Sequence, residues 1–144
     1  MGSWGPGSFE NDPALDFVGD LTESADGAPL RDALQRITAH DGTRQPSWFG
    51  RFMGRRADRL TIHHCQTAIA AAEMVAALRG RPPAKLPDKA ADWIAAHRAS
   101  SSDDLVAVAK AAIAAIKTDS ELRDEYDPAE WRDKMADLER RLEN

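Results

Sequence analysis

The sequence lacks the features by which several classes of protein are recognised. It has one cysteine in 144 residues, Cys65, so no internal disulfide can form, which favours a reducing compartment. No stretch approaches the ~18 consecutive apolar residues of a transmembrane helix. The first residues, Met1–Asp12, have neither the basic start nor the apolar centre of a secretion signal. We therefore expect a cytoplasmic protein with no membrane partner.

Strand patterns are also missing, because no window alternates apolar and polar residues. Hydrophobic residues make up 42% of the chain and charged residues 30%, as in globular proteins. Much of the apolar fraction is alanine, which favours helices and close helix packing. The sequence therefore predicts an all-α protein: one domain over residues 1–144, an irregular bundle of six or seven helices with a glycine-rich N-terminal loop packed on it.

Capping residues and apolar stripes predict where these helices lie. Asp12-Pro13 has the pattern of an N-cap followed by the first helical residue. The stretch 61–79 is apolar around much of its circumference, which predicts the most buried helix. In the last predicted helix Trp131 begins the apolar stripe, so we expect it to be a structural anchor.

The glycines of the opening segment do not form a phosphate-binding loop. A Walker loop needs Gly-Lys-Ser/Thr, and a dinucleotide loop follows a strand; neither condition is met. We expect Trp4 and Phe9 to insert into the helical core while Asn11 and Asp12 cap the first helix. The alternative interpretation of this segment is a ligand site, which Asn11, Asp12 and Asp16 would line.

Three stretches resemble a bacterial and phage family called domain of unknown function 4259. The opening Met-Gly-x-Trp-Gly-x-Gly-x-Phe-Glu-Asn-Asp, the Ala-Ala-Ala-Glu-x-x-Ala-Ala run at 70–77, and Ser-Glu-Leu at 120–122 with the later Tyr126 and Trp131 carry the resemblance. It implies no activity, cofactor or catalytic residue. Segment 42–60 is the expected point of departure from the family, as a basic aromatic insertion private to this chain.

Glu73 is the residue with the most chemical potential, since it lies inside the alanine-rich helix. A buried carboxylate needs a charged or hydrogen-bonding partner. The structural interpretation is a bond to the N-terminal loop or to an arginine, and the functional one is a general acid or base working with His64. Neighbouring His63 and His64 point about 100° apart on a helix, so they are poorly placed to share a metal ion. We predict no metal site and no cofactor.

Segment 42–60 combines aromatic and basic residues. It has five arginines and one acid, which gives a local charge of +4. Because the net charge of the whole chain is −5, the remaining residues carry −9. Two interpretations remain open: a core element that neutralises acidic flanks, or a binding surface. As a binding surface its contact residues are Trp48, Phe49, Arg51, Phe52, Arg55, Arg56 and Arg59.

Three functional hypotheses follow. The first is a non-enzymatic protein-interaction module, of the kind found among immunity, anti-defence and regulatory factors, with another protein as partner. The second is nucleic-acid binding through segment 42–60, which the charge elsewhere disfavours. The third is an unrecognised enzyme using Glu73 and His64.

Overall fold

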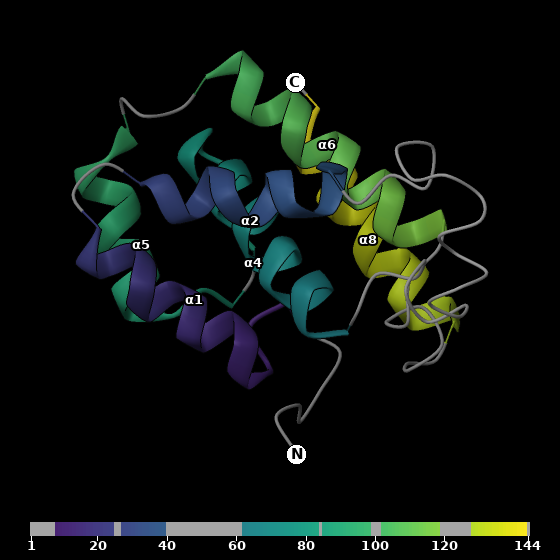
Figure 1. Ribbon diagram of the computed structural model, residues 1–144, viewed down its shortest axis with the longest axis horizontal. Coiled ribbons are helices and arrows are strands. Elements are labelled where there is room, and N and C mark those ends of the chain that lie inside the picture. The colour runs from purple at the N-terminus through teal and green to yellow at the C-terminus, as the bar shows by residue number, and fades with distance from the viewer. Residues whose placement is uncertain are drawn as a thin grey trace, which may run out of the picture.

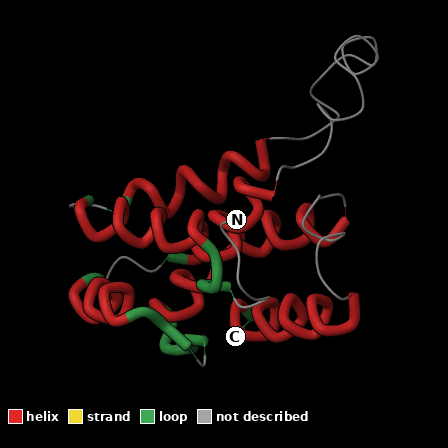
Figure 2. Tube along the Cα trace, turned by 90° about the horizontal axis from the view of Figure 1, so that it is seen from below, coloured by secondary structure: helices red, strands yellow, loops and turns green. Residues whose placement is uncertain are grey.

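The computed structural model describes residues 8–24, 27–39, 62–83, 85–98, 102–118 and 128–143. Every regular element in these residues is an α-helix, which confirms the predicted all-α class (Figures 1 and 2). The helices are α1 (Asp12–Glu23), α2 (Ala28–Ala39), α4 (Ile62–Leu78), α5 (Asp88–Ala96), α6 (Asp103–Thr118) and α8 (Pro128–Leu142). None of the helices in this part of the chain has the length and apolar composition needed to span a bilayer.

Helix α4 is the centre of the packing. It contacts each of the other described helices, and it lies between α2 and α1 in Figure 1. Every residue from Ala68 to Leu78 is buried, so this helix has no solvent-facing side over three turns. Its many alanines explain this arrangement, because small side chains let neighbouring helices approach from all directions. The prediction that stretch 61–79 is the most buried helix is confirmed.

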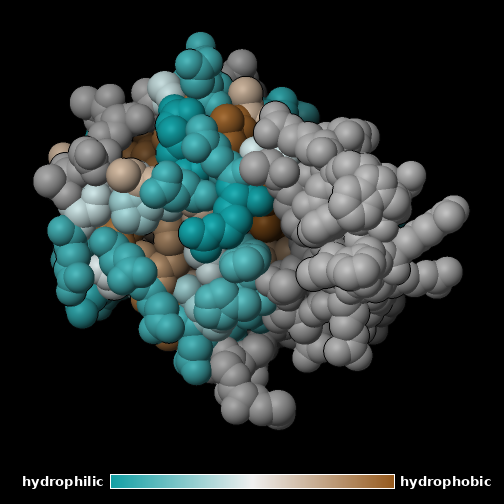
Figure 3. Space-filling view, viewed as in Figure 1, coloured by the Kyte–Doolittle hydropathy of each residue, from teal (hydrophilic) through white to brown (hydrophobic). Residues whose placement is uncertain are grey.

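The other helices present one apolar stripe each to this centre. In α6 the stripe includes Leu105, Ala109, Ile113 and Ile116, all buried at helical spacing. The outer surface is polar: Leu15 is the large hydrophobic side chain exposed among the described residues, at 39%. Figure 3 shows hydrophilic side chains over much of the described part of one face. The apolar side chains of the described residues therefore pack between the helices and do not form a second apolar region on the outside.

Glycine ends α4. Gly80 has a φ of +86°, a conformation that L side chains rarely adopt. Its N–H donates to the Ala77 carbonyl at 2.9 Å, and the N–H of Arg81 donates to the Ala76 carbonyl at 2.9 Å. These two bonds form a Schellman motif, which satisfies carbonyls that the helix end leaves free. The motif turns the chain toward the segment 83–87 that borders the cleft described below.

The start of α1 differs from the sequence prediction. Asn11, not Asp12, is the N-cap: its backbone is extended, and its side-chain Oδ1 accepts a hydrogen bond from the Ala14 N–H at 2.8 Å. Asp12 is exposed and occupies the first helical position, with Pro13 second. The prediction was wrong because proline is tolerated throughout the first turn, where N–H groups have no helical partner, so it does not fix the cap position.

Substitution distinguishes the two cap candidates. We expect Asn11→Ala to lower the free energy of unfolding by about 1 kcal/mol, because the cap bond is buried. Asp12→Ala removes only an exposed acid in the first turn, so it should cost about 0.3–1 kcal/mol, through the helix dipole. Urea unfolding followed by circular dichroism measures both, and added salt should reduce only the Asp12 effect. A larger loss for Asp12→Ala contradicts the assignment.

Gly27 directly precedes α2 and lies close to an aromatic ring. Its φ is +74°, and a Cβ placed there would lie 3.2 Å from Cζ2 of Trp93, which is buried on α5. The glycine therefore serves two needs: the left-handed turn between α1 and α2, and the close approach of the indole ring. Gly19, inside α1, serves neither, since a Cβ there meets nothing within 4 Å.

The two glycines should respond to alanine with opposite signs. Gly27→Ala should destabilise the fold by about 1–3 kcal/mol, because it combines an unfavourable φ with a clash against Trp93. Gly19→Ala should stabilise it by about 0.5–1 kcal/mol, since alanine costs less backbone entropy inside a helix. Urea denaturation of both variants beside the parent protein measures the difference. Equal effects of both changes contradict this account.

Candidate functional site

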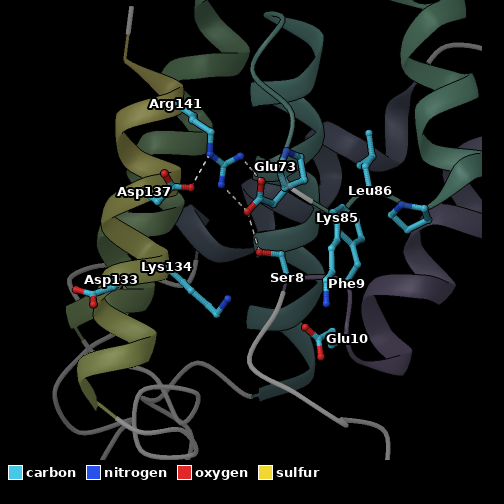
Figure 4. A pocket seen from close by; sticks show the side chains of 12 residues that line it. Ser8, Phe9, Glu10, Glu73, Lys85, Leu86, Asp133, Lys134, Asp137 and Arg141 are labelled. Carbon is cyan, nitrogen blue, oxygen red and sulfur yellow. Dashed lines mark hydrogen bonds and ion pairs between the residues drawn. The ribbon is translucent and has the colours of Figure 1, made fainter.

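A cleft of about 810 Å³ lies among the described residues (Figure 4). Its walls come from the N-terminal segment 8–10, from Pro83 and residues 85–87 after α4, and from α8, with Glu73 of α4 at its floor. The volume falls in the range of small-ligand pockets. The lining residues are Ser8, Phe9, Glu10, Glu73, Pro83, Lys85, Leu86, Pro87, Asp133, Lys134, Asp137 and Arg141.

A buried ion pair forms the floor of the cleft. Arg141 Nη1 lies 2.6 Å from Glu73 Oε2, and its Nη2 donates to Oε1 at 3.1 Å, so the contact is bidentate. Glu73 is 3% exposed, and the Arg141 side chain is 17% exposed. Such a pair joins the central helix to the last turn of α8. A cation also suits that position, since the helix dipole places negative charge at the C-terminal end.

Two more side chains complete the cluster. Ser8 Oγ donates to Glu73 Oε1 at 2.8 Å, which ties the N-terminal segment to the same carboxylate. Asp137, one helical turn before Arg141, accepts from its Nε at 2.8 Å. Burial lowers the pKa of Arg141, but hydrogen bonds and charge from Glu73 and Asp137 outweigh it, so the pKa is raised above the ordinary value of an arginine. The guanidinium is therefore a permanent cation.

This arrangement does not resemble a hydrolytic centre. Glu73 accepts from both Arg141 and Ser8, so its oxygens are engaged by donors rather than directed at a substrate. Ser8 needs a neighbouring base to become a nucleophile, and its carboxylate partner is held by a guanidinium. No histidine or cysteine is among the described residues that line the cleft. The geometry supports a structural link between three parts of the chain.

Helix geometry also separates the two residues of the enzyme hypothesis. Glu73 and His64 are nine residues apart on α4. That spacing places them about 13 Å apart along the axis and roughly on opposite sides of the helix. An acid–base pair needs to reach the same substrate atoms. The idea that Glu73 and His64 act together is therefore corrected by the fold.

Comparison with known proteins places the chain in a family. The family described as domain of unknown function (DUF4259) matches residues 2–45 and 49–135. The chain belongs to this family. No curated protein and no solved structure matches it. The DUF4259 match includes the α1 opening, Glu73 of α4 and Asp133 of α8, but it ends before Arg141, the partner of Glu73.

The match is interrupted within the basic segment. Residues 42–45 and 49–60 fall inside the DUF4259 match, and only 46–48 interrupt it. That segment 42–60 is a basic aromatic insertion stays a prediction. The proposed contact residues in it lie outside the residues that the structure describes: Trp48, Phe49, Arg51, Phe52, Arg55, Arg56 and Arg59.

The other residues singled out in the sequence have different surroundings. Phe9 and Trp131 are buried at 8% and 4%, and Asn11 is buried as the α1 cap. Asp12 is exposed, and Trp4 lies outside the described residues. The His63 and His64 rings are 5.9 Å apart and edge to face. Among the described residues, no three potential ligands from His, Cys, Asp and Glu are grouped to hold a metal ion.

Sequence reasoning did not find Ser8, Asp137 or Arg141. Arg141 is 68 residues from Glu73, and no periodicity links them. Asp137 and Arg141 have the ordinary i, i+4 spacing of a solvent-facing pair, so nothing in the sequence marks them as different. The one available signal was the buried position of Glu73, which demands a cation without identifying it.

A double-mutant cycle measures the ion pair. We expect Arg141→Met to destabilise the protein by roughly 3 kcal/mol, because Glu73 is left buried without its cation. Glu73→Gln should lower the free energy of unfolding by a smaller amount, because the Arg141 guanidinium still has its ion pair with Asp137. The double variant should lose at least about 1 kcal/mol less than the sum of the two single losses.

The matched control for this cycle is Arg140→Met. Arg140 is exposed and also lies beside Asp137, at 3.3 Å, so its removal should change stability by no more than about 0.5 kcal/mol. Urea unfolding gives all four values. A coupling energy of zero between Glu73 and Arg141 means that the pair does not hold the fold together.

Proposed function

We propose that this protein is a non-enzymatic interaction module that binds another protein. The observation that carries the proposal is the state of Glu73: its carboxylate oxygens are engaged by the Arg141 guanidinium and the Ser8 hydroxyl. In the part of the chain that the structure describes, the buried acid is Glu73, and it is committed to holding the fold, which leaves the surface for function. Binding to a partner is the function that such a surface supports.

Charge on the described surface favours a basic partner face. The outward side of α1 carries Asp12, Asp16, Asp20 and Glu23, all exposed, and this helix has no basic residue. Immunity and anti-defence factors use acidic faces of this kind to cover basic surfaces, through steering and complementarity. We propose the same class of role here, in the cytoplasm, where a single buried cysteine is at no disadvantage.

Segment 42–60 is the proposed second contact region. Arginine side chains bind carboxylates in a bidentate manner, and large aromatics anchor interfaces by burying much area. The segment holds five arginines beside Trp48, Phe49 and Phe52. An acidic α1 face and a basic aromatic segment together suit a partner that carries both signs of charge. Nucleic acid, by contrast, meets a net charge of −9 over the rest of the chain.

Affinity capture with matched variants tests this function. Trp48→Ala combined with Arg55→Ala and Arg56→Ala should remove the captured protein or reduce it at least about tenfold, because anchors of these types dominate interface energy. Arg31→Ala with Arg36→Ala removes two exposed arginines from α2 and should leave capture unchanged. Quantitative mass spectrometry of the captured material measures both.

Two outcomes contradict the proposal. One is the same set of captured proteins with the segment variant, its control and the parent. The other is retention of an oligonucleotide at physiological salt by the parent but not by the segment variant, which favours the nucleic-acid alternative.

A further inference from the structure

The cleft beside α8 has free cations that the Glu73–Arg141 link does not use. Lys85 and Lys134 line it, and neither ammonium group has a hydrogen bond or ion pair among the described residues. In Figure 4 the two side chains extend from opposite walls toward the space in front of Ser8. Lys134 is only half-exposed. Two unpaired cations that face each other across a cleft are suited to one anionic group between them.

The acids of the cleft do not cancel these lysines. Asp137 and Glu73 are both engaged by Arg141. The Asp133 side chain is directed away from the cleft in Figure 4. Glu10 remains as an acceptor on the N-terminal wall, also without a partner among the described residues. The free polar groups inside the cleft are thus two cationic donors and one acceptor.

Apolar side chains form the remaining wall. Phe9 is buried at 8%, and Leu86 is half-buried and packed against the core, with Pro83 and Pro87 on either side. Prolines limit backbone freedom, so this wall is preorganised to receive an apolar group. A ligand that fits the cleft therefore has one anionic group, an apolar portion, and a hydrogen-bond donor for Glu10.

We propose that the cleft binds the C-terminal end of a partner polypeptide. The terminal carboxylate lies between Lys85 and Lys134, and the last side chain, an apolar one, packs against Phe9 and Leu86. A backbone N–H of the peptide donates to Glu10. A free fatty acid offers the carboxylate and the apolar part but no N–H donor, which is why a polypeptide fits better. The volume of about 810 Å³ also has room for several residues.

This inference rests on the proposed function and names one contact of the partner. The test uses the full chain, labelled with ¹⁵N, and a tetrapeptide pool randomised at three positions with leucine last. We expect the free-acid pool to shift the amide resonances of Ser8, Leu86 and Lys134 in a saturable manner. The same pool with an amidated C-terminus should bind at least about tenfold more weakly, because a charge-assisted contact is lost.

Variants assign the effect to the lysines. Lys85→Met with Lys134→Met keeps the apolar stems and should weaken binding of the free-acid pool at least about tenfold. Lys89→Met with Lys110→Met removes two exposed lysines elsewhere and should bind as the parent does. Thermal melts show that each variant is folded.

Three results overturn the inference. They are no shifts with the free-acid pool at about 5 mM, well above a 1 mM dissociation constant; equal binding of the amidated pool; or octanoate binding as tightly as the peptides. If this test fails while partner capture still depends on segment 42–60, only the cleft assignment falls. If partner capture does not depend on segment 42–60 but the peptide pool binds, the contact with the partner is assigned to the cleft instead of to that segment.

Discussion

The constraint on which the rest of the structure depends is the burial of α4 on all sides from Ala68 to Leu78. A helix surrounded on all sides satisfies its own backbone, but any polar side chain on it must find a partner within the protein. Glu73 is such a side chain, 3% exposed in the middle of an alanine-rich run. Its bidentate contact with Arg141 answers that demand. The same contact decides where α8 ends against the central helix.

The link extends beyond the two helices. Ser8 brings the N-terminal segment to the carboxylate, and Arg81, just after α4, donates to the Glu143 carbonyl at the end of α8. Three segments far apart in the sequence therefore meet at one charged cluster. The cleft lies at this meeting point, so its shape depends on the same contacts that Ser8, Glu73 and Arg141 make with one another. A binding surface gains precision when it is supported by such a fixed framework.

Local sequence rules predicted much of the helical architecture. The alanine-rich composition identified α4 as the most buried helix, and the apolar stripe that begins at Trp131 belongs to α8. The N-cap of α1 was misplaced by one residue, because Asn11 and Asp12 are both good caps and Pro13 is compatible with either. Packing on Trp93 explains the glycine at position 27, and no local pattern contained that information.

The sequence by itself determined that the protein is helical, which stripes are buried, and that Glu73 requires a partner. Those properties follow from residue type and from spacings of three or four, which act within one helix. Only the tertiary structure decided that the partner of Glu73 is Arg141 and that Lys85 and Lys134 share a cleft. The physical reason is that these relations join residues tens of positions apart, and the packing of whole helices sets their distances.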